Sequence, residues 1–133
     1  MNAQRPLVLY RRAMKSEADL LRCLTDCDAD SVSEVLAFPA WAPARGRLNN
    51  TLTPKAKMLV RLAALVALDA STTSFRWAVE GACAAGAADD EIVAVLMSVG
   101  ADVGAPRLVS SAPRLALAIG YDIEFEGWDG ERS

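Results

Sequence analysis

Few residues in this chain can do chemistry, because the sequence contains no histidine. Histidine is the side chain most used for proton transfer near neutral pH and the commonest transition-metal ligand. Any acid–base step must therefore use carboxylates, hydroxyls or thiols. The three cysteines, Cys23, Cys27 and Cys83, are odd in number and show neither the spacing of a zinc site nor a C-x-x-C motif. We therefore expect reduced thiols, no structural disulfide and no metal site.

Length, composition and charge restrict the class of protein. The 133 residues correspond to one domain, and a hydrophobic content of 53% supplies a packed core and excludes a disordered chain. Fourteen basic against seventeen acidic residues, without a basic tract, argue against nucleic acid as a partner. The N-terminal apolar run is shorter than a signal-peptide core, and the most hydrophobic stretch, 58–68, covers about half of the ~20 residues that a bilayer span needs. We therefore expect a cytoplasmic protein without a membrane partner.

An all-α fold is expected, because alanine and leucine dominate and aromatic residues make up only 6% of the chain. Apolar periodicity and helix start and stop signals predict about six helices, over residues 16–24, 31–36, 54–68, 75–85, 89–103 and 106–119. Residues 1–52 are expected to hold two helices and a Pro-rich loop, residues 53–120 the helical core, and residues 121–133 a C-terminal arm or tail. These three segments are expected to form a single domain.

Three positions carry specific local predictions. Ser31 and Glu34 have the spacing of a capping box, which predicts that the second helix begins at Ser31. Trp41 lies in a loop rich in Pro and Gly, and so large an apolar residue is expected to pack against or bind something. Pro113 removes the amide that would donate to the carbonyl of Val109, which predicts a kink or a break in the last helix.

The helix expected over residues 54–68 is apolar on nearly all sides, whereas a surface helix of a small monomer needs one polar face. Two explanations remain open. Either a neighbouring subunit covers this helix in an oligomer, or the helix is central and is surrounded by its own chain.

A series of short motifs resembles the carboxymuconolactone decarboxylase and alkylhydroperoxidase D superfamily over residues 53–120. The motifs are Thr53-Pro54, Leu68-Asp69-Ala70-Ser71, Ala84-Ala85-Gly86-Ala87, Asp90-Glu91-Ile92 and Gly104-Ala105-Pro106, separated by apolar helices. The resemblance implies a small all-helical subunit that assembles as a homotrimer or hexamer. It also implies a site close to the start of the helix that follows Ser71.

The redox branch of this superfamily uses two cysteines, a histidine and a glutamate that this chain lacks. The resemblance places the two cysteines at Ser71 and Ser74, the histidine at Ala78, and the glutamate at Met58 or Leu59. A hydroxyl has no accessible thiolate chemistry and cannot form a disulfide, so peroxidase activity by that route is excluded. The decarboxylase branch also relies on a histidine near this helix start, which argues against literal carboxymuconolactone decarboxylation here.

The small residues at these positions predict a pocket. Ser71, Ser74 and Ala78 lie along one face of a helix start with Trp77 alongside, and free backbone amides there favour a carboxylate. Arg76 is a further candidate binding residue. The alternative interpretations are structural: the two serines are helix N-caps, and Trp77 belongs to the core or to an interface.

Two classes of function follow. In the first, the protein is a cofactor-free lyase or isomerase acting on a small metabolite, with Glu80 as the general base and Asp69 as the second candidate. In the second, it is a catalytically silent oligomeric binding or scaffold protein of the same fold. Arg76 and Glu80, four residues apart, could then be no more than a solvated helix pair.

A redox role for Cys23 and Cys27 is disfavoured, since two cysteines four apart on one helix lie too far from each other for a disulfide. Cys83 is expected to be buried and inert.

Overall fold

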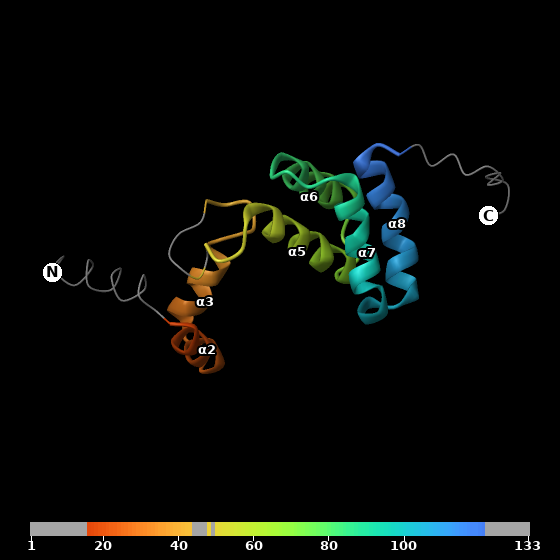
Figure 1. The fold of residues 1–133 in the computed structure, drawn as a ribbon. Coiled ribbons are helices and arrows are strands. Elements are labelled where there is room, and N and C mark those ends of the chain that lie inside the picture. The colour runs from red at the N-terminus through yellow and green to blue at the C-terminus, as the bar shows by residue number, and fades with distance from the viewer. Residues whose placement is uncertain (1–15, 44–47, 49, 122–133) are drawn as a thin grey trace. The chain divides into compact units, whose positions relative to one another are not determined.

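The computed structural model describes residues 16–43, 48 and 50–121, and this part of the chain contains six helices and no strand (Figure 1). The all-α prediction is therefore confirmed. The helices are α2 (Glu17–Thr25), α3 (Ala29–Leu36), α5 (Pro54–Ala67), α6 (Thr72–Ala84), α7 (Asp89–Val103) and α8 (Ala105–Ile119). None of these helices is long and apolar enough to cross a membrane. The chain divides into two compact units, Met1–Thr53 and Pro54–Ser133.

The first unit contains α2 and α3, each begun by a side-chain cap. The Ser16 hydroxyl accepts the Asp19 amide at 3.2 Å, and the Asp28 carboxylate accepts the Ser31 amide at 3.0 Å. The second helix therefore begins two residues before Ser31, and the capping box predicted at Ser31 is wrong. Asp28 takes the cap because Ser31 lies one turn inside the helix, where its hydroxyl also donates to Asp28 at 2.6 Å.

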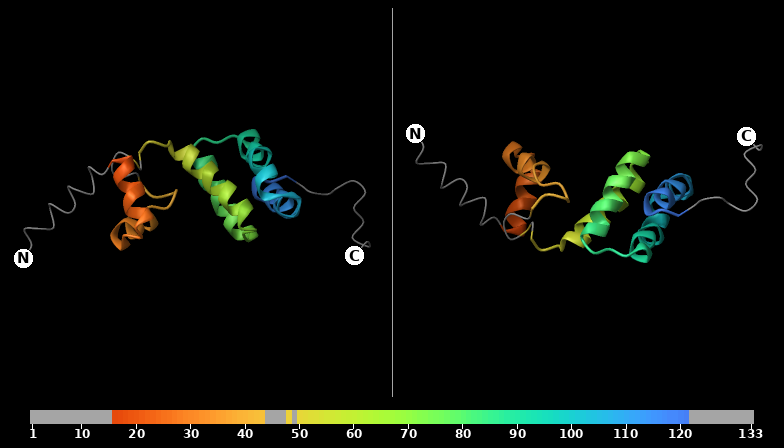
Figure 2. Two further views of the ribbon diagram at one scale, coloured as in Figure 1. Left: turned by 90° about the horizontal axis from the view of Figure 1, so that it is seen from below. Right: turned by 90° about the horizontal axis from the view of Figure 1, so that it is seen from above.

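The second unit contains the remaining four helices. Helix α5 packs against α6 and α7, and α8 packs against the same two helices and, less extensively, against α5. Figure 2 shows these helices from two further sides. The core side chains are apolar with one exception: Met58, Leu62, Val66, Phe75, Ala78, Val79, Ala82, Ala87, Ile92, Val95, Leu115 and the polar Ser111. The Ser111 hydroxyl is buried without a hydrogen-bond partner.

Two polar contacts fix the start of α7. The Glu91 carboxylate accepts the Ala88 amide at 3.2 Å and forms an ion pair of 3.1 Å with Lys55 of α5. Acidic residues at a helix N-terminus also interact favourably with the helix dipole. Asp89, Asp90 and Glu91 all lie in the first turn of α7.

Four of the described helices end in the same hydrogen-bonded turn. In this Schellman motif, the residue after the helix adopts a positive φ and two amides return to carbonyls of the last turn. Gly86 and Gly120 occupy this position at the ends of α6 and α8, with φ of 95° and 85°. Cys27 and Asp69 occupy it at the ends of α2 and α5, with φ of 56° and 52°.

Helix α8 is continuous from Ala105 to Ile119 through Pro113, so the break predicted there does not occur. Both Pro113 and Val109, whose carbonyl loses its helical donor, lie on the exposed side of the helix. Water can therefore satisfy that carbonyl. The packing of α8 against α6 and α7 holds the two halves of the helix together.

The expectation that Cys83 is buried is wrong, because Cys83 is an exposed free thiol. Trp41 is exposed within the first unit, and a binding role for this residue stays a prediction. Met97 and Val93 of α7 are also exposed, and the buried residues of this helix are Ile92 and Val95. The expected arm lies outside the described residues except for Tyr121.

Candidate functional site

The turn between α5 and α6 leads the chain into the predicted site. Asp69 ends α5 in the left-handed conformation, and its amide donates to the Val66 carbonyl at 3.2 Å. The Ala70 amide donates to the Leu65 carbonyl at 3.1 Å, which completes the Schellman motif. The turn thus reverses the chain within two residues, and α6 begins immediately after Ser71.

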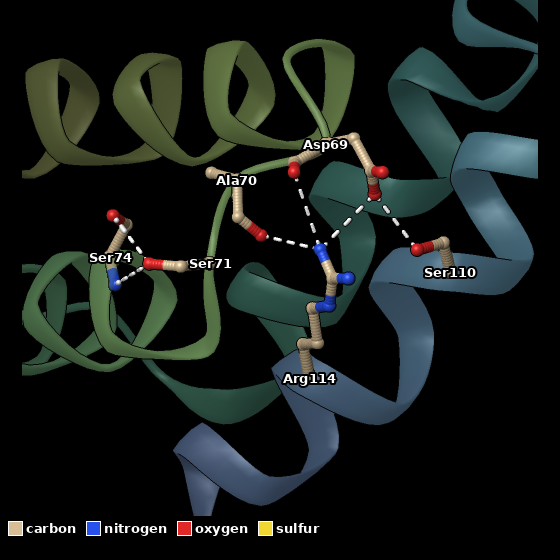
Figure 3. A network of polar contacts seen from close by, with 6 residues as sticks. All are labelled: Asp69, Ala70, Ser71, Ser74, Ser110 and Arg114. Carbon is tan, nitrogen blue, oxygen red and sulfur yellow. Dashed lines mark hydrogen bonds and ion pairs between the residues drawn. The ribbon is translucent and has the colours of Figure 1, made fainter.

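Two residues of α8 hold this turn in place (Figure 3). Arg114 Nη1 donates to the Ala70 carbonyl at 2.6 Å and forms an ion pair of 3.1 Å with Asp69 Oδ1. The Ser110 hydroxyl donates to the same Asp69 oxygen at 2.8 Å. The Asp69 side chain is therefore already engaged by a cation and a hydroxyl.

Ser71 is the N-cap of α6. Its hydroxyl oxygen accepts the Ser74 amide at 3.2 Å, and the two serine hydroxyl oxygens lie 3.1 Å apart (Figure 3). This confirms the capping interpretation of Ser71 and brings Ser74 into contact with it. Contact of Ser71 or Ser74 with a ligand stays a prediction.

The other predicted site residues of α6 separate onto two faces. Arg76, Trp77 and Glu80 are exposed, with 65% of Trp77 accessible, whereas Ala78 is fully buried in the core. Arg76 and Glu80 are both described, and they do not form the expected ion pair. The structure therefore does not bring Trp77 and Ala78 to one surface of this chain.

The inner face of α6 near Ala78 is filled by its own chain. Met58 of α5 is buried, and its terminal methyl group occupies the space into which a Cβ at Gly81 would project. Gly81 lies three residues beyond Ala78, on the same side of the helix. Any cavity at this helix start must therefore lie toward Ser71, not toward Gly81.

Sequence reasoning missed Arg114 and Ser110. The available signal was their spacing of four residues on α8, which places a cation and a hydroxyl on one side of a helix that has no acidic residue. No sequence pattern near Ser110 or Arg114 indicates that they contact Asp69.

The sequence profile of the carboxymuconolactone decarboxylase family matches residues 29–117. The chain belongs to this family. The matched region includes α3, α5, α6, α7 and most of α8. It therefore begins earlier in the chain than residue 53, where the motifs of the resemblance begin. Neither the curated proteins nor the solved structures gave a match to the chain.

The structure also bears on the thiol chemistry of this family. The two positions assigned to the redox cysteines carry serine hydroxyls in contact with each other, and no sulfur. The three cysteines that are present are free. Cys27 lies beyond the end of α2 in the left-handed region, so it does not share a helix with Cys23 as expected. Within the described residues, no group of three or more His, Cys, Asp or Glu side chains could hold a metal ion.

Proposed function

We propose that this carboxymuconolactone decarboxylase family protein binds a small organic acid at the start of α6 and acts on it without a cofactor or a redox cysteine pair. The observation that carries the proposal is the position of Arg114. Its guanidinium lies 2.6 Å from the Ala70 carbonyl, directly before the N-cap of α6. A cation beside the free amides of a helix N-terminus favours a carboxylate.

The guanidinium retains donors for such a ligand. Arginine carries five N–H groups in a planar fork, and the contacts described for Arg114 all start at Nη1. The side chain is half-buried, so a bound carboxylate would be partly shielded from water. Ser71 and Ser74 would position the ligand, with Arg76 and Trp77 contacting it from the exposed side of α6.

Calorimetric titration of the full chain with a panel of small cyclic carboxylic acids tests this proposal. We expect a bound acid whose affinity falls at least tenfold in Arg114→Gln and is retained within a few-fold in Arg107→Gln, an exposed arginine on the same helix. The corresponding neutral alcohols should bind more weakly than the acids. Arg114→Lys separates charge from geometry, since it keeps the cation and loses the fork.

Failure of every acid to bind, or equal loss in the two glutamine variants, would refute an acid site at this position. Ser71→Ala and Ser74→Ala should leave any activity within about tenfold, because a lost helix cap costs around 1 kcal/mol. Alkylation of the thiols should leave binding unchanged.

The proposed chemistry is proton transfer of the lyase or isomerase type. Asp69 is engaged by Arg114 and Ser110, whereas Glu80 is exposed and would be available as the general base once a neighbouring subunit covers α6. Glu80→Gln should abolish turnover of a bound acid and leave its affinity within a few-fold. Turnover is measured by following substrate and product by NMR.

A second candidate function is a catalytically silent binding or scaffold protein of the same fold. The exposure of Glu80 in the single chain favours it, because a cofactor-free enzyme needs an ionisable group within its site. Binding of an acid without turnover, in both the native chain and Glu80→Gln, would support this second function. A peroxidase-type activity is the least supported.

We also propose that the protein is a homotrimer or hexamer in the cytoplasm. Exposed apolar side chains on α5, α6 and α7, namely Val60, Trp77 and Met97, support self-association.

A further inference from the structure

The core of the second unit contains a hydroxyl without a partner. Ser111 of α8 is fully buried, and its hydroxyl oxygen makes no hydrogen bond. The other polar residue that is fully buried in the described part of the chain, Ser31, donates its hydroxyl to Asp28 at 2.6 Å. A buried hydroxyl without a hydrogen bond costs free energy, so its presence in a folded protein calls for an explanation.

The usual local partner of a helical serine is not used by Ser111. Serine hydroxyls inside helices often donate to the carbonyl four residues earlier. Ser98 of α7 does so, at 2.9 Å from the Ala94 carbonyl. The Ser111 hydroxyl makes no such bond to the Arg107 carbonyl, so it can bond to a group from outside its own helix.

Ser111 lies at the level of the α5–α6 turn. Ser110 and Arg114, on either side of it along α8, both contact Asp69 (Figure 3). Asp69 precedes the N-cap of α6 by two residues. The stretch of α8 that contains Ser111 is therefore adjacent to the start of α6.

Helical periodicity directs Ser111 into the bundle beside this turn. Residues three apart on an α-helix are separated by about 60° around its axis. Leu108, three residues before Ser111, lies against Gly100 of α7, and Arg114, three residues after it, faces the turn. Ser111 is therefore directed between α7 and the turn, toward the inner side of the α6 start.

We propose that the Ser111 hydroxyl binds a second oxygen of the ligand, so that the ligand is a small cyclic acid with a ring hydroxyl or a ring carbonyl. This inference rests on the acid site proposed above. The carboxylate lies at Arg114 and the first amides of α6, and the ring extends inward to Ser111. A serine hydroxyl can donate to a carbonyl and can also accept from a hydroxyl.

The spacing of the two residues fits a ligand of this size. Side chains three residues apart on a helix begin about 5–6 Å from each other, which a six-membered ring substituted at positions 1 and 3 or 1 and 4 can bridge. An acid without the second oxygen leaves the buried hydroxyl unpaired. Ser111 is thus a specificity-determining residue, whereas Arg114 binds the carboxylate that all these acids share.

Calorimetric titration of the full chain with matched acids tests this assignment. The probes are cyclohexanecarboxylic acid and its 3-oxo, 4-oxo, 3-hydroxy and 4-hydroxy derivatives. At least one derivative should bind about tenfold more tightly than the parent acid, because it gains a hydrogen bond to an unpaired buried hydroxyl. Ser111→Ala should abolish this preference and leave the affinity for the parent acid within about twofold. Ser98→Ala, at an exposed serine of α7, is the matched control and should keep the preference.

Thermal unfolding without ligand gives a second readout. Ser111→Ala should raise the unfolding midpoint, because it removes a buried hydroxyl that has no partner. A lower midpoint would show that the hydroxyl is bonded within the folded chain and would overturn the inference.

The titrations separate this inference from the acid site itself. Equal affinity of the native chain for all five acids, or a preference that survives in Ser111→Ala, would overturn the role of Ser111 and leave the acid site in place. Failure of all five acids to bind would refute the acid site and this inference together.

Discussion

Asp69 supports the α5–α6 turn through both its backbone and its side chain. Its backbone adopts the left-handed conformation that other helices of this bundle give to glycine, and its carboxylate accepts from Arg114 and Ser110. Aspartate tolerates this conformation better than most residues, since its short polar side chain can bond locally. The residue therefore has a structural role that competes with the role of a general base.

Asp69→Ala should lower the free energy of unfolding by about 1–2 kcal/mol, because the variant loses a partly exposed ion pair and places an alanine at positive φ. Asp69→Asn should lose less, since asparagine accepts the Ser110 hydroxyl and tolerates this conformation. Urea denaturation measures both. Asp102→Ala, at an exposed carboxylate on α7, is the control and should change stability by less than about 0.5 kcal/mol. Equal stability of Asp69→Ala and the native chain would show that the turn does not depend on this side chain.

At the scale of the elements, helix boundaries are set by contacts three to five residues apart, and the sequence predicts most of them. Ser16, Ser71, Gly86, Gly104 and Gly120 begin or end helices as expected. Asp28 was missed because the preceding turn uses Cys27 at positive φ, a residue type that gives no signal for this conformation.

The candidate site was less predictable for a different reason. Ser110 and Arg114 lie 41 and 45 residues beyond Asp69 in the sequence, and only the packing of α8 brings them to the turn. The sequence could suggest the N-cap role of Ser71 because helix capping is local, whereas the place of the site was implied by the family resemblance and stays a prediction. It could not show that Ala78 is enclosed by core residues while Trp77 points outward, since both follow from which face of α6 the bundle covers.

Two glycines should respond to alanine in opposite directions. Gly86→Ala should lower the free energy of unfolding by about 1–2 kcal/mol, because φ is 95° there and alanine is strained in that region. Apart from its two neighbours in the chain, no residue comes within 4 Å of the added Cβ, so the cost comes from the backbone conformation. Gly100→Ala, within α7, should raise stability by up to about 1 kcal/mol, since its Cβ would meet Leu108 at an ordinary distance of 3.5 Å. Thermal and urea unfolding of both variants check these signs, and a stabilising Gly86→Ala would contradict the Schellman assignment.

The contact between α5 and α7 should make stability depend on pH. The amide of Ala88, followed by Lys55, holds the pKa of Glu91 below its ordinary value. A carboxyl whose pKa is lower in the folded state stabilises the protein above its unfolded pKa, and this contribution is lost as pH falls through the folded pKa. The stability difference between the native chain and Glu91→Gln should therefore be largest near pH 7 and shrink in acid.

Unfolding midpoints measured from pH 7 to pH 3 test this dependence. Asp102→Asn provides the matched control, and its difference from the native chain should vary less with pH. A Glu91→Gln difference that is constant across this range would contradict the role of the carboxylate.

For the whole molecule, the main question is what covers its exposed apolar side chains. Trp77, Val60 and Met97 belong to three different helices of the second unit, and all three side chains are more than half exposed. We expect light scattering after size exclusion to give three or six times the chain mass of 14.2 kDa. Trp77→Glu should shift this mass toward that of one chain, because it places a charge in an apolar interface, whereas Arg107→Glu should not. A native protein of single-chain mass at all concentrations would remove the proposed cover for Glu80.

A crystal structure of this chain soaked with small cyclic carboxylic acids tests the proposed acid site most directly. We expect a ligand whose carboxylate contacts Arg114 and the first amides of α6 beside Ser71. A ligand bound elsewhere, or a helix start closed by side chains on every side with no bound acid, would contradict it.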